Sequence, residues 1–487
     1  MKVENKGLAF SIFEEVNLLG VEYCHWKSTD HLEASFRGET DFDVLVSKND
    51  AFKFEVVLLN NGFVRARTPD FRTYPCVEDY IYYDPSSGNW YHFHLHYQLP
   101  CGDRWVKSFH IPIEKYILEN RVYLAEFSMY NIDPLSEYLF FINRMFMKWR
   151  RPLRKKSFVK ENEYLVGRID TNCLLDRDHP LFSDDLHSIY KMLTNKDYSI
   201  PISRQIAFKN HLRGCRRFNE VDFSIRSLFR YVYRLYVELN RRVFNNKSFG
   251  RRQLINGGRI VTFVGMDGSG KTSMLSEAEK TFSKQLNVTT VFLGSGRSGA
   301  HFLRRNIFKF MDILPNNALT KNKVGKTGSN NKKPKFFKCL WIYLCLCDRE
   351  KELKKMAKGL ANGSLVLVDR WPQNKITNVA DAKKLNEFVL NNSFTGLVAR
   401  KEQLFFDRLK AFNPDRTLWF DILPDTSIQR KPNELDLEEA VFYKDALQHL
   451  YSDYYSNPSK IFADNAYDEV KLEVNRKIWE CINGKAI

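Results

Sequence analysis

The sequence predicts an α/β protein whose C-terminal half contains a parallel sheet covered by helices on both faces. From residue 259 onward, short apolar segments alternate with segments of helical composition, as buried parallel strands do; the apolar segments are RIVTFVG, TTVFLG, SLVLVD and RTLWFDI. The first 110 residues differ. There, polar and apolar residues alternate within DFDVLV and WYHFHLHYQL, so we expect an α+β fold in that part of the chain.

The chain has 487 residues and 44% hydrophobic content, which exceeds what one hydrophobic core supports and suffices for two or three. We expect three regions: an N-terminal domain at 1–128, a helical connector at 129–250 and a C-terminal domain at 256–487. The stretch NNKSFGRRQLINGG ahead of the third region is rich in Gly, Asn and basic residues. This composition is typical of a domain boundary.

The last helix of the connector is amphipathic. Arg226, Arg230 and Arg234 form a stripe beside an apolar face that consists of Ile225, Leu228, Phe229, Val232, Tyr236, Leu239 and Val243. Such a face commonly packs against a neighbouring domain, with the arginines in solvent or in ion pairs, and we expect this arrangement here. Peripheral contact with a membrane surface is the alternative.

The positive charge is unevenly distributed. The chain has 75 Lys and Arg against 58 Asp and Glu, a formal net charge of +17, and residues 301–360 contain 15 basic residues but only four acids. Within this segment, residues 318–338 are polar and nearly free of large apolar side chains, so we expect a loop. Nucleic acid, acidic glycan, anionic lipid and nucleotide all suit such a loop as ligands, and so does a solvated insertion without a ligand.

Cysteine usage and hydropathy favour a cytoplasmic protein. The nine cysteines are scattered and odd in number, which argues against a disulfide framework. The N-terminus MKVENKGLAFSIFEEV has no signal-peptide core. The apolar run CLWIYLCLC is much shorter than the roughly 20 residues that span a membrane.

A phosphate-binding motif lies between the first strand and the first helix of the third region. Residues 258–275 read GRIVTFVGMDGSGKTSML and match G-x-x-x-x-G-K-S/T completely. Glycines let successive N–H groups turn inward around an anion, which also meets the N-terminus of the following helix. The expected nucleotide-binding residues are Gly265, Gly268, Ser269, Gly270, Lys271, Thr272 and Ser273.

Three side chains of the motif have expected chemical roles. The ammonium of Lys271 reaches the β and γ phosphates of a nucleotide, and the hydroxyl of Thr272 is a ligand of Mg²⁺. A carboxylate inside a phosphate-binding loop indicates a cationic or proton-bearing group opposite it, so we interpret Asp267 as facing the reaction. A surface turn residue is the alternative for Asp267.

A second motif is expected to face the first. Strand SLVLVD ends in Asp369, and Arg370 follows. Since the carboxyl ends of parallel strands meet at one edge of a sheet, this pair should lie opposite the phosphate-binding loop. There, Asp369 would hold Mg²⁺ or accept a proton and Arg370 would bind a phosphoryl oxygen; a simple ion pair at the strand end is the alternative.

With these motifs, residues 258–485 resemble the thymidylate kinase-like branch of P-loop kinases. The resemblance rests on VGMDGSGKTS, VLVDRW, NPDRTLWFDILPDTSIQR and KIFADNAYDEV. It implies a P-loop kinase fold with ATP and Mg²⁺ as cofactors. It also implies that Arg430, with Lys431, closes over the ATP phosphates and that Arg297 binds the phosphate of the acceptor.

The acceptor region departs from this family. The signature Arg-x-Pro-Gly-Gly-Thr is absent, GSGRSG at 294–299 stands in its place, and Trp371 replaces the usual Tyr or His. Phosphoryl transfer depends on positioning and on charge neutralisation at the γ-phosphate, so we expect the transfer itself to be retained. The default acceptor is dTMP, and a sugar or glycan is the other option.

The N-terminal domain contains two acids at strand spacing. In RGETDFDVLV, Asp41 and Asp43 point to one face of a strand, which suits metal-dependent nucleotidyl transfer. Residues 8–110 resemble the nucleotidyltransferase superfamily, with Lys27-Ser28 in place of Gly-Ser, and this resemblance implies that Asp41 and Asp43 bind metal. His94 stands where a third acid is expected, so a degenerate binding module is an equal alternative.

Strand WYHFHLHYQL also carries three histidines on one face, His92, His94 and His96. We expect them to be structural, because the sequence offers no convincing fourth ligand for zinc. Zinc binding is the alternative.

These features predict a phosphotransferase that moves the γ-phosphoryl group of ATP, with Mg²⁺, to a nucleoside monophosphate or to a sugar-type acceptor. Two alternatives stay open. In one, the C-terminal half is an ATPase switch and the N-terminal domain binds nucleic acid or a protein partner. In the other, the N-terminal domain is an active nucleotidyltransferase supplied by the kinase half. Nucleic acid is the less favoured partner, and a homodimer is compatible with the sequence.

Overall fold

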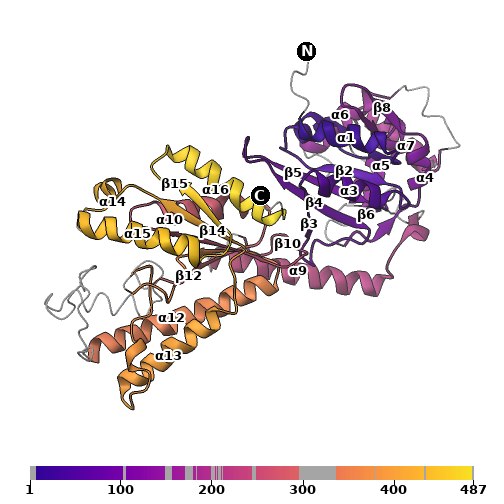
Figure 1. Ribbon diagram of the computed structural model, residues 1–487. Coiled ribbons are helices and arrows are strands. Elements are labelled where there is room, and N and C mark those ends of the chain that lie inside the picture. The colour runs from indigo at the N-terminus through magenta and orange to yellow at the C-terminus, as the bar shows by residue number, and fades with distance from the viewer. Residues whose placement is uncertain are drawn as a thin grey trace. The chain divides into compact units, whose positions relative to one another are not determined.

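The computed structural model consists of two compact units, residues 1–246 and 247–487, which are shown in Figure 1. Each unit has a sheet and a buried core of its own. The predicted division into three regions stays a prediction. The structure describes the whole chain except residues 1–6, 103–105, 148–155, 170–178, 182–183, 199–202, 204–205, 207–209, 211, 244–247, 295–335, 378, 433–434 and 485–487.

The first unit is built on a mixed sheet with strands in the order β3-β4-β5-β2-β1-β9-β8. Strand β2 runs parallel to β5 and β1 runs parallel to β9, whereas the other neighbours are antiparallel. The strands are β1 (Tyr23–His25), β2 (Phe42–Val46), β3 (Val64–Arg67), β4 (Val77–Tyr83), β5 (Trp90–His96), β8 (Val122–Leu124) and β9 (Met129–Asn131), and a separate pair is formed by β6 (Pro100–Cys101) and β7 (Phe109–His110).

The alternation in DFDVLV separates the two faces of this sheet. Phe42 and Val44 are fully buried in one hydrophobic cluster, where Phe42 stacks on Phe93 of β5 with ring centroids 4.6 Å apart. Leu45 belongs to a second cluster, and Asp43 faces the histidines of β5. Side chains of a strand alternate between faces, so the same register that buries the aromatic rings brings the acids together.

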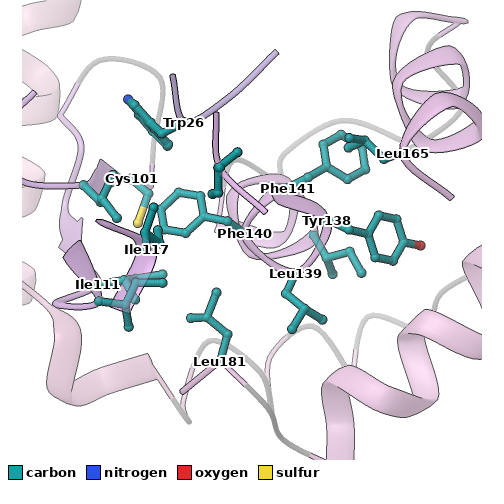
Figure 2. Close-up of a cluster of buried hydrophobic side chains, with 14 of the residues drawn as sticks. Trp26, Cys101, Ile111, Ile117, Tyr138, Leu139, Phe140, Phe141, Leu165 and Leu181 are labelled. Atoms are coloured by element: carbon teal, nitrogen blue, oxygen red, sulfur yellow. The ribbon is translucent and has the colours of Figure 1, made fainter. Parts of the chain in front are cut away.

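Helices cover both faces of the sheet. The helices of the first unit are α1 (Leu8–Leu18), α2 (Leu32–Phe36), α3 (Ala51–Asn60), α4 (Glu114–Glu119), α5 (Pro134–Met147), α6 (Lys156–Val166), α7 (Asp184–Thr194) and α9 (Glu220–Val243), with short 3₁₀ turns at Thr29–His31 and Leu212–Cys215. Figure 2 shows α5 at the centre of the second cluster, with Phe140 near Cys101 and Phe141 near Leu165. Trp26 meets Phe140 edge-on at 5.2 Å.

Helix α9 carries the amphipathic pattern expected of residues 220–243. The seven apolar side chains of the predicted face, from Ile225 to Val243, are 51–65% exposed. This face is therefore not buried within the first unit, and its packing against another domain stays a prediction. Within the described parts of the chain, no helix combines the length and the apolar character that crossing a bilayer requires.

The second unit has a sheet of five strands in the order β12-β13-β11-β14-β15, and every pair in it is parallel. This confirms the predicted parallel sheet. The strands are β11 (Arg259–Gly265), β12 (Val288–Phe292), β13 (Leu365–Asp369), β14 (Arg416–Asp421) and β15 (Pro458–Phe462), and the two-residue strand β10 (Gln253–Leu254) precedes them. Their central residues are buried, as continuous apolar strands between helical layers require.

The helices of the second unit are α10 (Lys271–Phe282), α12 (Phe336–Ala361), α13 (Phe394–Leu409), α14 (Pro424–Arg430), α15 (Leu437–Asp453) and α16 (Tyr467–Ile482), with a 3₁₀ turn at Asn386–Phe388. Residues 336–338, the end of the predicted loop at 318–338, open helix α12, so the loop prediction is wrong there. The rest of that segment lies outside the described residues. Helix α12 begins at Phe336, whose ring packs against that of Phe394 on α13 with centroids 5.3 Å apart.

The stacked pair of Phe42 and Phe93 supports a stability prediction for the first unit. We expect Phe93→Ala to destabilise it by about 3–5 kcal/mol, because the lost ring leaves a cavity in a closely packed cluster. The matched control is Phe52→Ala, since Phe52 is 73% exposed on α3, and we expect a change of about 0.5 kcal/mol or less. Urea unfolding followed by tryptophan fluorescence measures both, and equal shifts in the two variants would contradict the packing described here.

Candidate active site

The loop between β11 and α10 is shaped by glycines with positive φ: 150° at Gly265 and 83° at both Gly268 and Gly270. A Cβ atom on Gly265 would lie 2.7 Å from the carbonyl oxygen of Phe420, and one on Gly268 would lie 2.9 Å from that of Ser427. These neighbours are backbone atoms that cannot rotate away. Nothing lies within 4 Å of a Cβ on Gly270, so only its left-handed φ favours glycine there.

The side chain of Lys271 lies inside this loop. Lys271 is only 6% exposed, and its ammonium donates to the carbonyl oxygen of Met266 and to Oγ of Ser269 at 3.3 Å. Burial lowers the pKa of Lys271 from 10.5 to about 8, although the nearby carboxylate of Asp267 acts in the opposite direction. The loop is thus folded around a cation that has lost most of its hydration and is poised to meet an anion.

Thr272 joins the loop to the end of β13. Its hydroxyl donates to Oδ2 of Asp369 at 2.9 Å. The other carboxylate oxygen of Asp369, Oδ1, is buried and has no hydrogen-bond partner among the described residues. Burial raises the pKa of Asp369 above its ordinary value, although the bond from Thr272 favours the ionised form. An orphaned carboxylate oxygen beside a hydroxyl is a suitable place for a cation.

The register of the parallel strands brings Thr272 and Asp369 together. In the parallel pair of β11 and β13, Asp369 lies opposite Phe263, two residues before the loop begins at Gly265. Lys271 and Thr272 open α10, so the helix returns over the same edge of the sheet. The predicted convergence of the phosphate-binding loop and the Asp369-Arg370 pair is therefore what the structure shows.

Arg370 is held between two carboxylates. Its Nη2 donates to Oδ1 of Asp267 at 2.8 Å, and its Nη1 lies 3.5 Å from Oδ2 of Asp381. Burial by itself lowers the pKa of Arg370, but the charges of Asp381 and Asp267 outweigh burial and leave the pKa above its ordinary value. The backbone of Arg370 is left-handed, with φ of 70°, a conformation that costs about 1–2 kcal/mol and often marks functional positions.

Sequence reasoning missed the residues that fix this arginine. Asp381 is 3% exposed and also accepts from Nη2 of Arg349 at 3.0 Å. Beside it, the hydroxyl of Tyr443 accepts from the N–H of Ala380 at 2.7 Å, and burial raises the pKa of Tyr443 to about 12. Asp381 and Tyr443 lie in segments without a recognisable motif, and Arg349 is one of many basic residues in its segment, so no sequence signal connected them to the site.

Helix α14 lies against the other side of the loop. The hydroxyl of Ser427 donates to the carbonyl oxygen of Asp267 at 2.6 Å. Arg430, the predicted lid residue, is exposed at the end of α14, with Nη1 3.5 Å from the carbonyl oxygen of Gly268 and Nη2 3.1 Å from that of Ala463. Arg430 thus lies next to the phosphate-binding loop, where its guanidinium donates to backbone carbonyl oxygens.

The structure describes some of the remaining predicted residues of this site but not others. Ser269 donates to the carbonyl oxygen of Met266 at 2.8 Å and so stabilises the turn of the loop. Ser273 is exposed in the first turn of α10. Arg297, the predicted ligand of the acceptor phosphate, lies outside the described residues, as does most of the basic segment at 318–338.

The predicted metal ligands of the first unit, Asp41 and Asp43, both point toward β5. Oδ1 of Asp41 is 2.7 Å from Nδ1 of His92, and Oδ1 of Asp43 is 3.3 Å from Nδ1 of His94. The carboxylate that the sequence did not reveal is Asp79, which lies on β4 directly opposite His94. Asp79 was missed because it reaches the histidines only through the antiparallel pairing of β4 with β5. The sequence does not specify that pairing.

Attraction between opposite charges dominates the cluster of acids and histidines on β2, β4 and β5. Burial would raise the pKa of Asp43, but the ammonium of Lys27, 2.8 Å away, and the ring of His94 keep it well below its ordinary value. Burial likewise opposes ionisation of Asp79, yet hydrogen bonds from His92 and His94 lower its pKa. The cluster therefore holds three carboxylates in a partly buried site that demands positive charge.

The two loop glycines give a test of the site's construction. We expect Gly265→Ala to destabilise the second unit by about 2–4 kcal/mol, because it combines backbone crowding with an unfavourable φ. Gly270→Ala should cost about 1 kcal/mol, since it meets no neighbour. Urea unfolding of the two variants measures the difference, and a Gly270→Ala variant at least as unstable as Gly265→Ala would contradict this geometry.

Comparisons with known proteins concern less than half of the chain, and no family model matches it. The uncharacterized ATP-binding protein YghS of Escherichia coli is 24% identical over 180 residues, which are 36% of this chain and 74% of that protein. The related protein YghR of the same organism is 22% identical over 177 residues, 36% of this chain and 69% of that protein.

Thymidylate kinase of Staphylococcus epidermidis is 21% identical over 235 residues, 45% of this chain and 91% of that enzyme. A crystal structure of thymidylate kinase from Ehrlichia chaffeensis aligns with 45% of this chain and 98% of its own at 15% identity, with a TM-score of 0.25. The sequence match to the staphylococcal enzyme shows that about 45% of the chain is homologous to thymidylate kinase-like P-loop kinases.

Proposed function

We propose that the second unit is an ATP-dependent phosphotransferase. The observation that carries the proposal is the contact between Thr272 and Asp369, which brings a hydroxyl and a carboxylate together beside the buried ammonium of Lys271. Phosphoryl transfer needs an ammonium that binds the phosphates next to a hydroxyl and a carboxylate that hold a divalent cation. The similarity to ATP-binding proteins and to thymidylate kinase supports ATP as the donor.

The residues present fit Mg²⁺. Oδ1 of Asp369 is buried without a partner among the described residues, and the hydroxyl of Thr272 lies next to the same carboxylate. Mg²⁺ prefers oxygen ligands and usually binds through one or two protein groups, with water and phosphate completing its shell. Thr272 and Asp369 would hold the ion, which supplies neutralisation of the charge on the β and γ phosphates.

In the proposed reaction, an acceptor oxygen attacks the γ-phosphorus and the bond between that phosphorus and the β–γ bridging oxygen breaks, so ADP leaves. The loop N–H groups and Lys271 bind the phosphates and neutralise their charge. Arg370, whose guanidinium is oriented by Asp267 and Asp381, would bind an oxygen of the transferred γ-phosphoryl group. Arg430 can turn from Gly268 toward the phosphates, as a lid arginine supplied by the same chain does.

The acceptor decides the role of Asp267. A nucleoside monophosphate such as dTMP brings a phosphate oxygen that needs no deprotonation, and Arg370 would bind it directly. A sugar or glycan brings a hydroxyl, whose proton must pass to a base, and the partly exposed carboxylate of Asp267 is placed to receive it. Asp267→Asn should therefore lower transfer to a hydroxyl acceptor more than transfer to dTMP.

The function is tested by incubating the full chain with γ-labelled ATP and Mg²⁺ against dTMP, other nucleoside monophosphates, simple sugars and a cell extract. We expect label in one acceptor pool and a loss of at least about 100-fold in Lys271→Ala, since the buried ammonium contacts the transferred charge. The matched control is Lys280→Ala on the same helix, an exposed residue paired with Glu277, which should keep the activity.

The transferase proposal fails if no acceptor pool gains label and if the rate of ATP hydrolysis is the same with and without the acceptors. The ATPase-switch alternative would then hold. If Lys271→Ala keeps full activity, the proposed site is wrong altogether.

The pKa of Lys271 gives a pH prediction. Burial lowers this pKa to about 8, so the unoccupied site loses its ammonium as the pH rises through 8, and phosphate binding must then take up a proton. We expect the affinity for ATP to be nearly constant below pH 8 and to fall by up to about tenfold per pH unit above it. Calorimetry across pH 7–10 measures this dependence. Lys271→Met, which has no proton to lose, should bind weakly and without the added slope.

A further inference from the structure

The first unit contains a cluster that the proposed kinase function leaves unused. Three adjacent strands, β2, β5 and β4, place Asp43, His94 and Asp79 in one row, because Asp43 pairs with His94 and His94 pairs with Asp79. Two residues further along β5, His96 returns to the same face. Its Nε2 lies 3.2 Å from Oδ1 of Asp43.

Two of the three distances between the ligand atoms of Asp43, His94 and His96 match the edges of a coordination tetrahedron. Zinc binds histidine nitrogen and carboxylate oxygen at about 2.0–2.2 Å, which puts neighbouring ligand atoms of a tetrahedron about 3.3 Å apart. Oδ1 of Asp43 lies 3.3 Å from Nδ1 of His94 and 3.2 Å from Nε2 of His96. These atoms come together within 4.8 Å of one another without any rearrangement of the backbone.

The neighbouring histidine, His92, has a different geometry. Its two ring nitrogens lie 2.7 Å from Oδ1 of Asp41 and 2.7 Å from Oδ1 of Asp79, which are ordinary hydrogen-bond lengths. His92 is 1% exposed, so both bonds are shielded from water. We therefore assign His92 to the support of the site rather than to the set of ligands.

A second carboxylate orients one of the ligands. While Nδ1 of His94 faces Asp43, its Nε2 lies 3.1 Å from Oδ1 of Asp79. Metal-binding histidines almost always donate their other ring N–H to a carboxylate or carbonyl in this way. Asp79 is itself held by Thr68 and His92, so the ring of His94 is fixed before any ion arrives.

The donors distinguish between classes of ion. Two imidazole nitrogens and one carboxylate oxygen suit zinc and related transition metals, whereas Mg²⁺ requires oxygen ligands in octahedral geometry. The Mg²⁺-type site expected from Asp41 and Asp43 by resemblance therefore does not fit the residues present. The ammonium of Lys27, 2.8 Å from Oδ1 of Asp43, supplies the positive charge at this carboxylate.

We propose that the first unit binds one divalent transition-metal ion of the zinc class through Asp43, His94 and His96, with Asp79 as the partner of His94 and Lys27 as a competing cation. The side chains of Lys27 and His94 are 22% and 24% exposed, so solvent reaches the site. Three protein ligands leave a fourth position open, which is the arrangement of zinc sites that bind water or a substrate.

The proposal is tested on the full chain after treatment with a chelator. Co²⁺ binding followed by its visible absorption, and Zn²⁺ binding followed by calorimetry, should give one equivalent in tetrahedral coordination that excess Mg²⁺ does not displace. Trp26 provides a second readout, because its ring meets the ring of His96 edge-on at 5.1 Å. Co²⁺ at His96 should quench the fluorescence of Trp26, and Trp26→Phe should remove that change.

Variants separate ligands from supporting residues. His94→Asn and His96→Asn should abolish this binding, and Asp79→Asn should weaken it by about 10–100-fold. His110→Asn, the matched control outside the cluster, where His110 pairs with Glu114, should retain it. Lys27→Met should tighten binding, because Asp43 loses its competing cation. A cluster with only a structural role would show no such gain, since it would merely lose an ion pair.

Three results would overturn the proposal. They are the absence of Co²⁺ and Zn²⁺ binding by the folded chain, displacement of the ion by Mg²⁺, and loss of binding in His110→Asn with retention in His96→Asn. Near-ultraviolet circular dichroism checks the fold of each variant. If His94→Asn or His96→Asn does not fold, the gain in affinity of Lys27→Met decides, and unchanged or weaker binding in Lys27→Met counts against the site.

Discussion

The parallel register of β11 and β13 is the constraint on which the candidate active site depends. It sets Asp369 opposite Phe263, and the hydroxyl of Thr272 then lies within hydrogen-bond distance of that carboxylate. A shift of one residue would turn the Asp369 side chain to the other face of the sheet. The apolar residues of both strands oppose such a shift, because they are buried on both faces of the sheet and would have to repack against the opposite helical layers. Core packing and site chemistry are therefore fixed by the same pairing.

Motifs carried by contiguous residues could be predicted from the sequence. The loop from Gly265 to Thr272, the strand that ends in Asp369 and the parallel sheet all have local patterns, and the structure has each of them. Arg349, Asp381 and Tyr443 could not be predicted. Their contribution arises where segments distant in sequence meet, and an isolated acid or tyrosine carries no periodicity that would indicate its partner. The same reason hid Asp79 from the sequence.

The two units solve a similar electrostatic problem in different ways. In the second unit, Arg370 lies between two carboxylates whose positions are set by other contacts, so an arginine that cannot lose its charge is permanently oriented. In the first unit, Asp43 and Asp79 are balanced by the ammonium of Lys27 and by the ring of His94. The first arrangement suits repeated contact with phosphate, and the second suits exchange of one cation for another.

The left-handed backbone of Arg370 has a consequence for the evolution of this chain. Only glycine adopts φ of 70° without strain, so replacing Arg370 by glycine would relax the backbone while it removes the guanidinium. Selection for stability alone would favour such a replacement, and selection for the chemistry of the site opposes it. The fold thus carries a local backbone strain at a residue whose side chain is held by two carboxylates. Homologues that have lost the activity should be the first to abandon that arginine.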